Sequence, residues 1–123
     1  MTWIQTLSIA VASAADGTGT SYSEVVEGFV EMVKVTLGTL DTGAADLTIT
    51  DEETGAAIVT MTNITDGMTV HPRAATHDVA GAAALYAAGG AAVNDKIPVN
   101  GRIKVVVAQG GATKAGSIKV QLS

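Results

Sequence analysis

Two histidines, His71 and His77, are the side chains of this chain best suited to acid–base or metal chemistry. Asp66 and Asp78 lie close to them in sequence, and imidazole nitrogens together with carboxylate oxygens can bind a metal ion. The spacing of the two histidines matches no compact metal-binding pair on a helix or a hairpin. Hydrogen bonding within a loop and a contact between subunits both explain them better, and both roles stay open.

Covalent catalysis finds little support in the sequence. The chain has no cysteine, and a serine nucleophile requires a histidine placed as its base. The consecutive acids at 51–53 match neither the alternating ligands of a calcium loop nor a pair of glycosidase carboxylates, so we expect a solvated turn. The glycines at 17–19 and 110–111 lack the residues that complete a phosphate site. We therefore expect a protein that is not an enzyme and that uses no metal or cofactor.

The composition predicts one soluble domain whose surface suits contacts with other proteins. The chain of 123 residues has 47% hydrophobic residues, 15% charged residues and a net charge of −5. About 25% charged residues is usual, so uncharged side chains must cover much of the surface. The acidic balance and the low aromatic content disfavour nucleic-acid binding, and no apolar run is long enough to span a membrane.

Charge is distributed unevenly along the chain. Residues 1–72 contain ten acidic groups and one basic group, whereas residues 73–123 contain six basic and two acidic groups. In one interleaved sheet fold, this distribution could reflect attraction between neighbouring strands. Alternatively, copies of the protein dock with acidic against basic surfaces, which would orient an assembly.

Short strands separated by glycine, asparagine and aspartate turns are the recurring pattern. Apolar and polar residues alternate, as around Leu7, Ile9 and Val11, which is typical of a strand with one buried face. We expect strands at 7–11, 29–37, 47–50, 58–62, 67–71, 97–99, 102–108 and 117–122. These segments predict an all-β fold of seven to eight short antiparallel strands, a compact sandwich or barrel, as a single domain over residues 1–123.

The strand at 29–37 carries an irregularity. Its alternation places Phe29 and Val33 on the inward face, and it leaves the charged Glu31 discordant on that same face. A charged residue at an inward position indicates a β-bulge near the start of the strand.

Turn residues predict how several strands connect. The turn at 51–55 favours an antiparallel hairpin of 47–50 with 58–62, and the glycine-rich connection at 109–116 favours a second hairpin of 102–108 with 117–122. Residues 74–92 are rich in alanine and glycine. There we expect one long ordered crossover loop with a single helical turn, since an isolated helix of this length is marginal.

Residues 72–90, residues 102–111 and the turn at 16–20 leading to Gly28 resemble small virion proteins of tailed bacteriophages. The resemblance covers most of the chain, and its motifs are structural turns and loops. It implies a capsid decoration, or cement, protein with a jelly-roll-like β-sandwich. It further implies that the protein is made in the host cytoplasm, binds the outer surface of the head as a homotrimer, contacts the major capsid protein and stabilises the head.

The resemblance also directs attention to the loop that follows Pro72. Arginine and tyrosine are typical interface anchors, so we place candidate subunit contacts in this loop and in the N-terminal segment: Trp3, His71, Arg73, His77 and Tyr86. An alternative is that the loop pattern serves only to fix the fold.

Two other functions are compatible with the sequence. One is a receptor-binding or carbohydrate-binding module of a head fibre or tail, although the few aromatic residues form no evident sugar platform. The other is a small hydrolase that uses His71 or His77 with nearby acids. Replacing both histidines would then abolish an activity.

Overall fold

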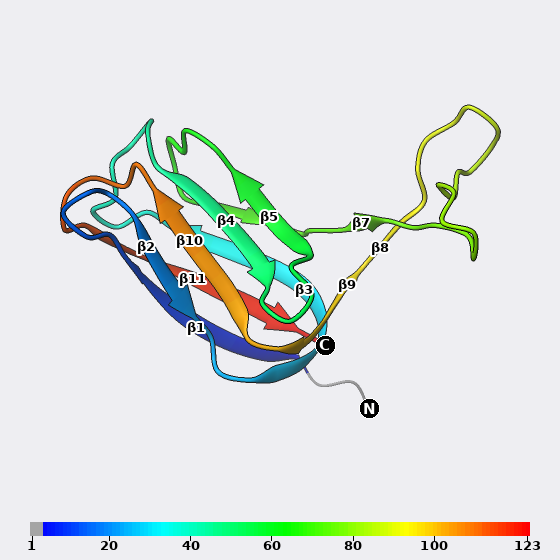
Figure 1. Ribbon diagram of the computed structural model, residues 1–123, viewed down its shortest axis with the longest axis horizontal. Helices are drawn as coiled ribbons and strands as arrows, with labels where there is room; N and C mark the ends of the chain where they lie inside the picture. The colour runs from blue at the N-terminus through cyan, green and yellow to red at the C-terminus, as the bar shows by residue number, and fades with distance from the viewer. Residues whose placement is uncertain (1–3) are drawn as a thin grey trace.

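The computed structural model describes residues 4–123 as two antiparallel β-sheets around one apolar core, with a narrow arm projecting from them (Figure 1). These residues form eleven strands and no helix, so the predicted all-β fold is confirmed. The three strands that we did not predict are short: β2 (Gly19–Tyr22), β7 (Ala74–Ala75) and β8 (Asn94–Asp95). Trp3 lies outside the described residues.

The first sheet places β1, β11 and β3 side by side, and both β6 and β9 pair with the far side of β3. All these pairs are antiparallel. Its strands are β1 (Gln5–Ala12), β11 (Ala115–Leu122), β3 (Val26–Thr36), β6 (Met68–Val70) and β9 (Ile97–Gly101). The chain leaves this sheet after β6 and returns at β9, so both ends of the arm lie along β3.

The second sheet has the order β2, β10, β4, β5, again antiparallel throughout. Its three longer strands are β10 (Ile103–Ala108), β4 (Asp46–Asp51) and β5 (Ala57–Met61). The predicted hairpin of 47–50 with 58–62 is confirmed, because β4 pairs with β5. The acids at its tip are not all solvated: Asp51 is buried, and its carboxylate accepts hydrogen bonds from the Glu53 amide (3.2 Å) and the Thr54 hydroxyl (3.1 Å).

Alternating side chains from both sheets fill the core. The inward residues of β1 are buried as the alternation predicted, and so are those of the two C-terminal strands. They are Leu7, Ile9 and Val11 on β1, Ile103, Val105 and Val107 on β10, and Ile118, Val120 and Leu122 on β11. Each of these three strands therefore keeps one face in the core and one face toward solvent.

The predicted bulge lies at Glu31, and it reverses our assignment of faces at the start of β3. Gln121 pairs with Met32 and Leu122 pairs with Val30, so Glu31 is the extra residue. Because one inserted residue moves the preceding side chains to the opposite face, Val30 is fully buried and Phe29 is 49% exposed. The prediction that Phe29 faces inward was therefore wrong.

The predicted hairpin of 102–108 with 117–122 was also wrong. β10 lies in the second sheet between β2 and β4, whereas β11 lies in the first sheet between β1 and β3. The glycine-rich connection at 109–116 crosses from one sheet to the other, with positive φ angles at Gln109, Gly111 and Thr113. Alternation indicates only that each strand has one buried face. Two strands that face each other across a core show the same alternation as two strands of one hairpin.

Candidate interaction arm and the clasp at its base

Residues 74–95 form the arm, which extends away from both sheets (Figure 1). None of these residues is buried. The apolar side chains near its far end are open to solvent, with Val79 fully exposed, Tyr86 75% exposed and Leu85 41% exposed. The arm therefore takes no part in the core of the described chain.

Backbone hydrogen bonds give the arm its shape. β7 pairs with β8, and two isolated bridges, His77 with Ala83 and Leu85 with Ala92, continue beyond them. Residues 74–92 form one long ordered segment, but the helical turn that we expected within it was wrong, because they contain no helix. Alanine favours a helix, but the glycines within this segment interrupt one, and Gly81 and Gly89 have positive φ angles.

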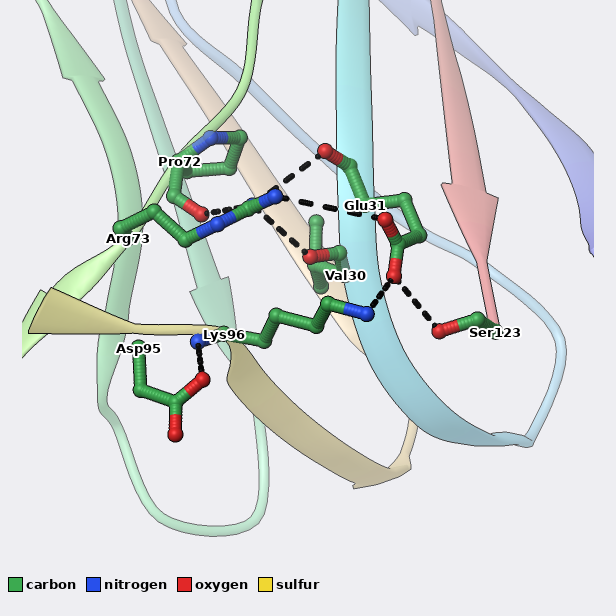
Figure 2. Close-up of polar contacts among 7 residues, drawn as sticks. All are labelled: Val30, Glu31, Pro72, Arg73, Asp95, Lys96 and Ser123. Carbon is green, nitrogen blue, oxygen red and sulfur yellow. Dashed lines mark hydrogen bonds and ion pairs between the residues drawn. The ribbon is translucent and has the colours of Figure 1, made fainter.

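One carboxylate, that of Glu31, is bound by both ends of the arm (Figure 2). Arg73, just before β7, places its Nη2 4.0 Å from Glu31 Oε2. Lys96, just after β8, forms an ion pair through Nζ with Glu31 Oε1. The Ser123 hydroxyl donates a hydrogen bond to the same Oε1 at 2.7 Å. We call Glu31, Arg73 and Lys96 the clasp.

The bulge explains why the clasp forms at this position. Because Glu31 is the inserted residue, its side chain points outward beside the ends of the arm. Arg73 Nη1 donates to the carbonyl oxygens of Pro72 (2.7 Å), Glu31 (3.3 Å) and Val30 (3.4 Å). The guanidinium thus binds backbone acceptors where the inserted residue disturbs the β3 ladder.

The clasp perturbs the acidity of Glu31. The hydrogen bond from Lys96 holds the pKa of Glu31 below its ordinary value, and the Ser123 hydroxyl and the charge of Arg73 act in the same direction. Partial desolvation raises this pKa, but its effect is smaller than that of the Lys96 or the Ser123 hydrogen bond. At neutral pH Glu31 is therefore ionised and able to hold both cations.

The predicted interface residues do not form one cluster. His71 is exposed at the end of β6, and Arg73 lies at the base of the arm. His77 and Tyr86 lie further along the arm, both exposed. Within the described residues, the side-chain hydrogen bonds of the segment 71–86 involve Arg73, Thr76 and Asp78 and neither imidazole. A subunit contact through the histidines stays a prediction.

The structure also bears on metal and membrane sites. Within residues 4–123, no three His, Cys, Asp or Glu side chains gather as a potential metal-binding group. The same residues include no helix of the length and hydropathy needed to cross a bilayer. An open groove between the start of β1 and the β2–β3 connection is lined by residues 5–7, residues 24–27 and Asn100, and neither histidine is among them.

Glu31 and Lys96 are functional candidates that the sequence reasoning did not select. The discordant charge at Glu31 was a usable signal, since a carboxylate inside an alternating strand requires a partner. Nothing local to Lys96 marks it, because its contact with Glu31 depends on the return of the arm to β3. No protein-family model, curated protein or solved structure matches the chain.

Proposed function

We propose that this chain is a non-enzymatic structural protein of a tailed-phage virion, which binds the outer capsid surface through its arm and stabilises the head. The observation that carries the proposal is an ordered arm with no buried residue, held at its base by the clasp. An ordered apolar segment outside the core is suited to burial against another protein.

The chemistry of the arm suits a protein partner. Residues 74–95 include only two charged side chains, Asp78 and Asp95. The Asp78 carboxylate accepts hydrogen bonds from the amides of Ala80 (2.9 Å) and Ala82 (3.0 Å) and so belongs to the turn. Burying a side chain of the size of Leu85 contributes roughly 1.5–3 kcal/mol. On a capsid, a modest gain for each copy is repeated at every lattice position.

The strand order gives independent support. Most connections cross between the sheets, apart from the β4–β5 hairpin and the arm between β6 and β9, so that β1, β11, β3 and β6 face β2, β10, β4 and β5, with β9 as an additional strand on β3. We assign this order to the jelly-roll class, in which two four-stranded sheets exchange successive strands. Viral capsid and lectin domains both use this class, so the fold is compatible with the proposal, and the arm supplies the functional argument.

A shortened arm tests the proposal. Residues 76–93 are replaced by Asn-Gly, which suits a two-residue hairpin because Ala75 pairs with Asn94. Both proteins are mixed with heads of the encoding phage that were prepared without this chain, and the heads are sedimented. We expect the full chain to sediment with the heads and the shortened chain to remain in solution with an unchanged far-ultraviolet dichroism spectrum.

Two results would contradict the proposal. If the full chain stays in solution with heads, it does not bind capsids. If the shortened chain binds as well as the full chain, the arm is not the attachment element. A specific glycan-array signal that disappears with the arm would instead support the carbohydrate-binding alternative.

A further inference from the structure

The solvent side of β3 carries an ordered series of side chains. Val26, Val30 and Val33 point toward the core, so Glu27, Phe29, Met32 and Lys34 lie on the outer face of the first sheet. Phe29 is 49% exposed, Met32 is half-buried, and the two charged residues are exposed. Glu31 also points outward between Phe29 and Met32, where Arg73 and Lys96 already pair with it. Along the strand the order is therefore acid, apolar, the clasp, apolar, base.

A second lysine strengthens the basic end of this face. Lys119 on β11 is directly opposite Lys34 on β3, and the same row continues to Ser8 on β1 and Thr69 on β6. Like charges directly opposite each other on neighbouring strands are destabilising. Within residues 4–123, the ion pairs are Arg73 and Lys96 with Glu31 and Arg102 with Glu52, so neither of these two lysines has an acidic partner.

The acidic end also has no cation beside it. Glu27 pairs across the ladder with Asn100 of β9, and its carboxylate forms no ion pair within the described residues. Glu27 and Lys34 are seven positions apart on one strand, which is roughly 23 Å at the rise of an extended chain. They are too far apart to neutralise each other within one molecule.

We propose that this outer face binds a second copy of the chain, with the two β3 strands antiparallel across a two-fold axis. Glu27 of each copy then faces Lys34 and Lys119 of the other, and Phe29 and Met32 of both copies lie near the centre, beside the two clasps. An isologous contact requires a surface that is complementary to itself. The mirrored order of charge along β3 meets this requirement.

The same order favours a second copy over an unrelated acidic protein. An acidic partner would match the two lysines but would repel Glu27, whereas a second copy matches both ends. The face spans roughly 500 Å² on each copy, estimated from the strand spacing and rise, so we expect a weak and reversible dimer. This inference depends on the outer face of the first sheet and is independent of capsid binding.

Charge reversal tests the contact by sedimentation velocity over a concentration series. Lys34→Glu places a new carboxylate against Glu27 of the other copy, and Glu27→Lys places lysine side chains of the two copies together. We expect the wild-type chain to dimerise and each variant alone to associate at least about tenfold more weakly. An equimolar mixture of the two variants should regain the dimer, because acid then faces base at both ends.

Lys104→Glu is the matched control, since Lys104 is a lysine on the outer face of the second sheet, and we expect it to leave dimerisation unchanged. Circular dichroism establishes that each variant is folded. The proposal is overturned if the wild-type chain is monomeric throughout the series, if it forms the trimer that the phage resemblance implies, or if mixing the variants restores nothing.

Discussion

Leu47 of the sandwich and Leu85 of the arm show how differently the two regions use the same residue type. Leu47 is 1% exposed between the two sheets, whereas Leu85 is 41% exposed on the arm. The sheets are stabilised by a continuous apolar core. The arm keeps its shape through backbone hydrogen bonds such as Thr76 N–H to Val93 O (2.8 Å) and through the clasp at its base.

We therefore assign the stability of the fold to the sheets and the binding of a partner to the arm. Changes in the sheets should alter the free energy of unfolding, and changes in the arm should alter contacts with a partner while leaving that free energy almost unchanged. The clasp connects the two regions, because Glu31 belongs to β3 while Arg73 and Lys96 flank the arm.

The largest effect is expected from truncating a core leucine. Leu47→Ala should lower the free energy of unfolding by about 2–5 kcal/mol, since it removes buried methyl groups and leaves a cavity. The matched change Leu85→Ala should lie within about 0.5 kcal/mol of wild type. Urea denaturation measures both. Equal losses for the two variants would show that the arm packs on the sandwich.

Removing the charge of Glu31 should loosen the base of the arm. In Glu31→Gln, we expect the Thr76 and Val93 amides to exchange hydrogen roughly threefold to tenfold faster, while amides of β10 are unaffected. Exchange followed by mass spectrometry measures this. Glu53→Gln is the control, because Glu53 is exposed and forms no ion pair within residues 4–123. Unchanged exchange in Glu31→Gln would show that the clasp does not restrain the arm.

Low pH should also speed hydrogen exchange at the base of the arm, as Glu31→Gln does. The pKa of Glu31 is lowered in the folded chain, chiefly by Lys96, so the clasp is complete above the ordinary glutamate pKa of 4.5 and is lost as the pH falls through the lowered value. Exchange at Thr76, corrected for its intrinsic pH dependence, should rise in the wild type over that interval and stay level in Glu31→Gln. A parallel rise in both proteins would exclude Glu31 as the titrating group.

The smallest effect is expected at an ion pair within the sandwich. The Arg102 guanidinium donates to both carboxylate oxygens of Glu52, at 3.1 and 2.6 Å, and lies 4.1 Å from the centre of the Tyr22 ring. Because these groups are substantially exposed, Arg102→Ala should cost only about 0.5 kcal/mol in unfolding free energy and leave exchange in the arm unchanged. Faster exchange at Thr76 would show coupling between this pair and the arm.

The sequence predicted which residues each strand buries better than which strands become neighbours. Alternation depends on residue type alone, so Leu7, Ile9 and Val11 were assigned correctly. Pairing depends on the path of the chain, and β10 and β11 consequently occupy different sheets although their alternation suited a hairpin. Phe29 was misassigned because an inserted residue reverses the inward or outward orientation of the side chains that precede it in the strand.

The candidate site was predictable only in part. The family resemblance, with the interface preference of arginine and tyrosine, drew attention to Arg73, His77 and Tyr86, and the discordant charge marked Glu31 as irregular. The projection of the arm could not be predicted, because alanine and glycine are compatible with a helix end, a covered loop or an exposed hairpin. The contact between Glu31 and Lys96 arises only when β9 returns to β3.

Hydrogen exchange of the arm, compared between the free chain and the chain bound to phage heads, tests the central claim most directly. If the arm is the attachment element, amides from 76–93 should exchange at least about tenfold more slowly on the head, whereas those of β10 should not change. Protection confined to the sheets, with the arm exchanging as fast as in the free chain, would contradict the account.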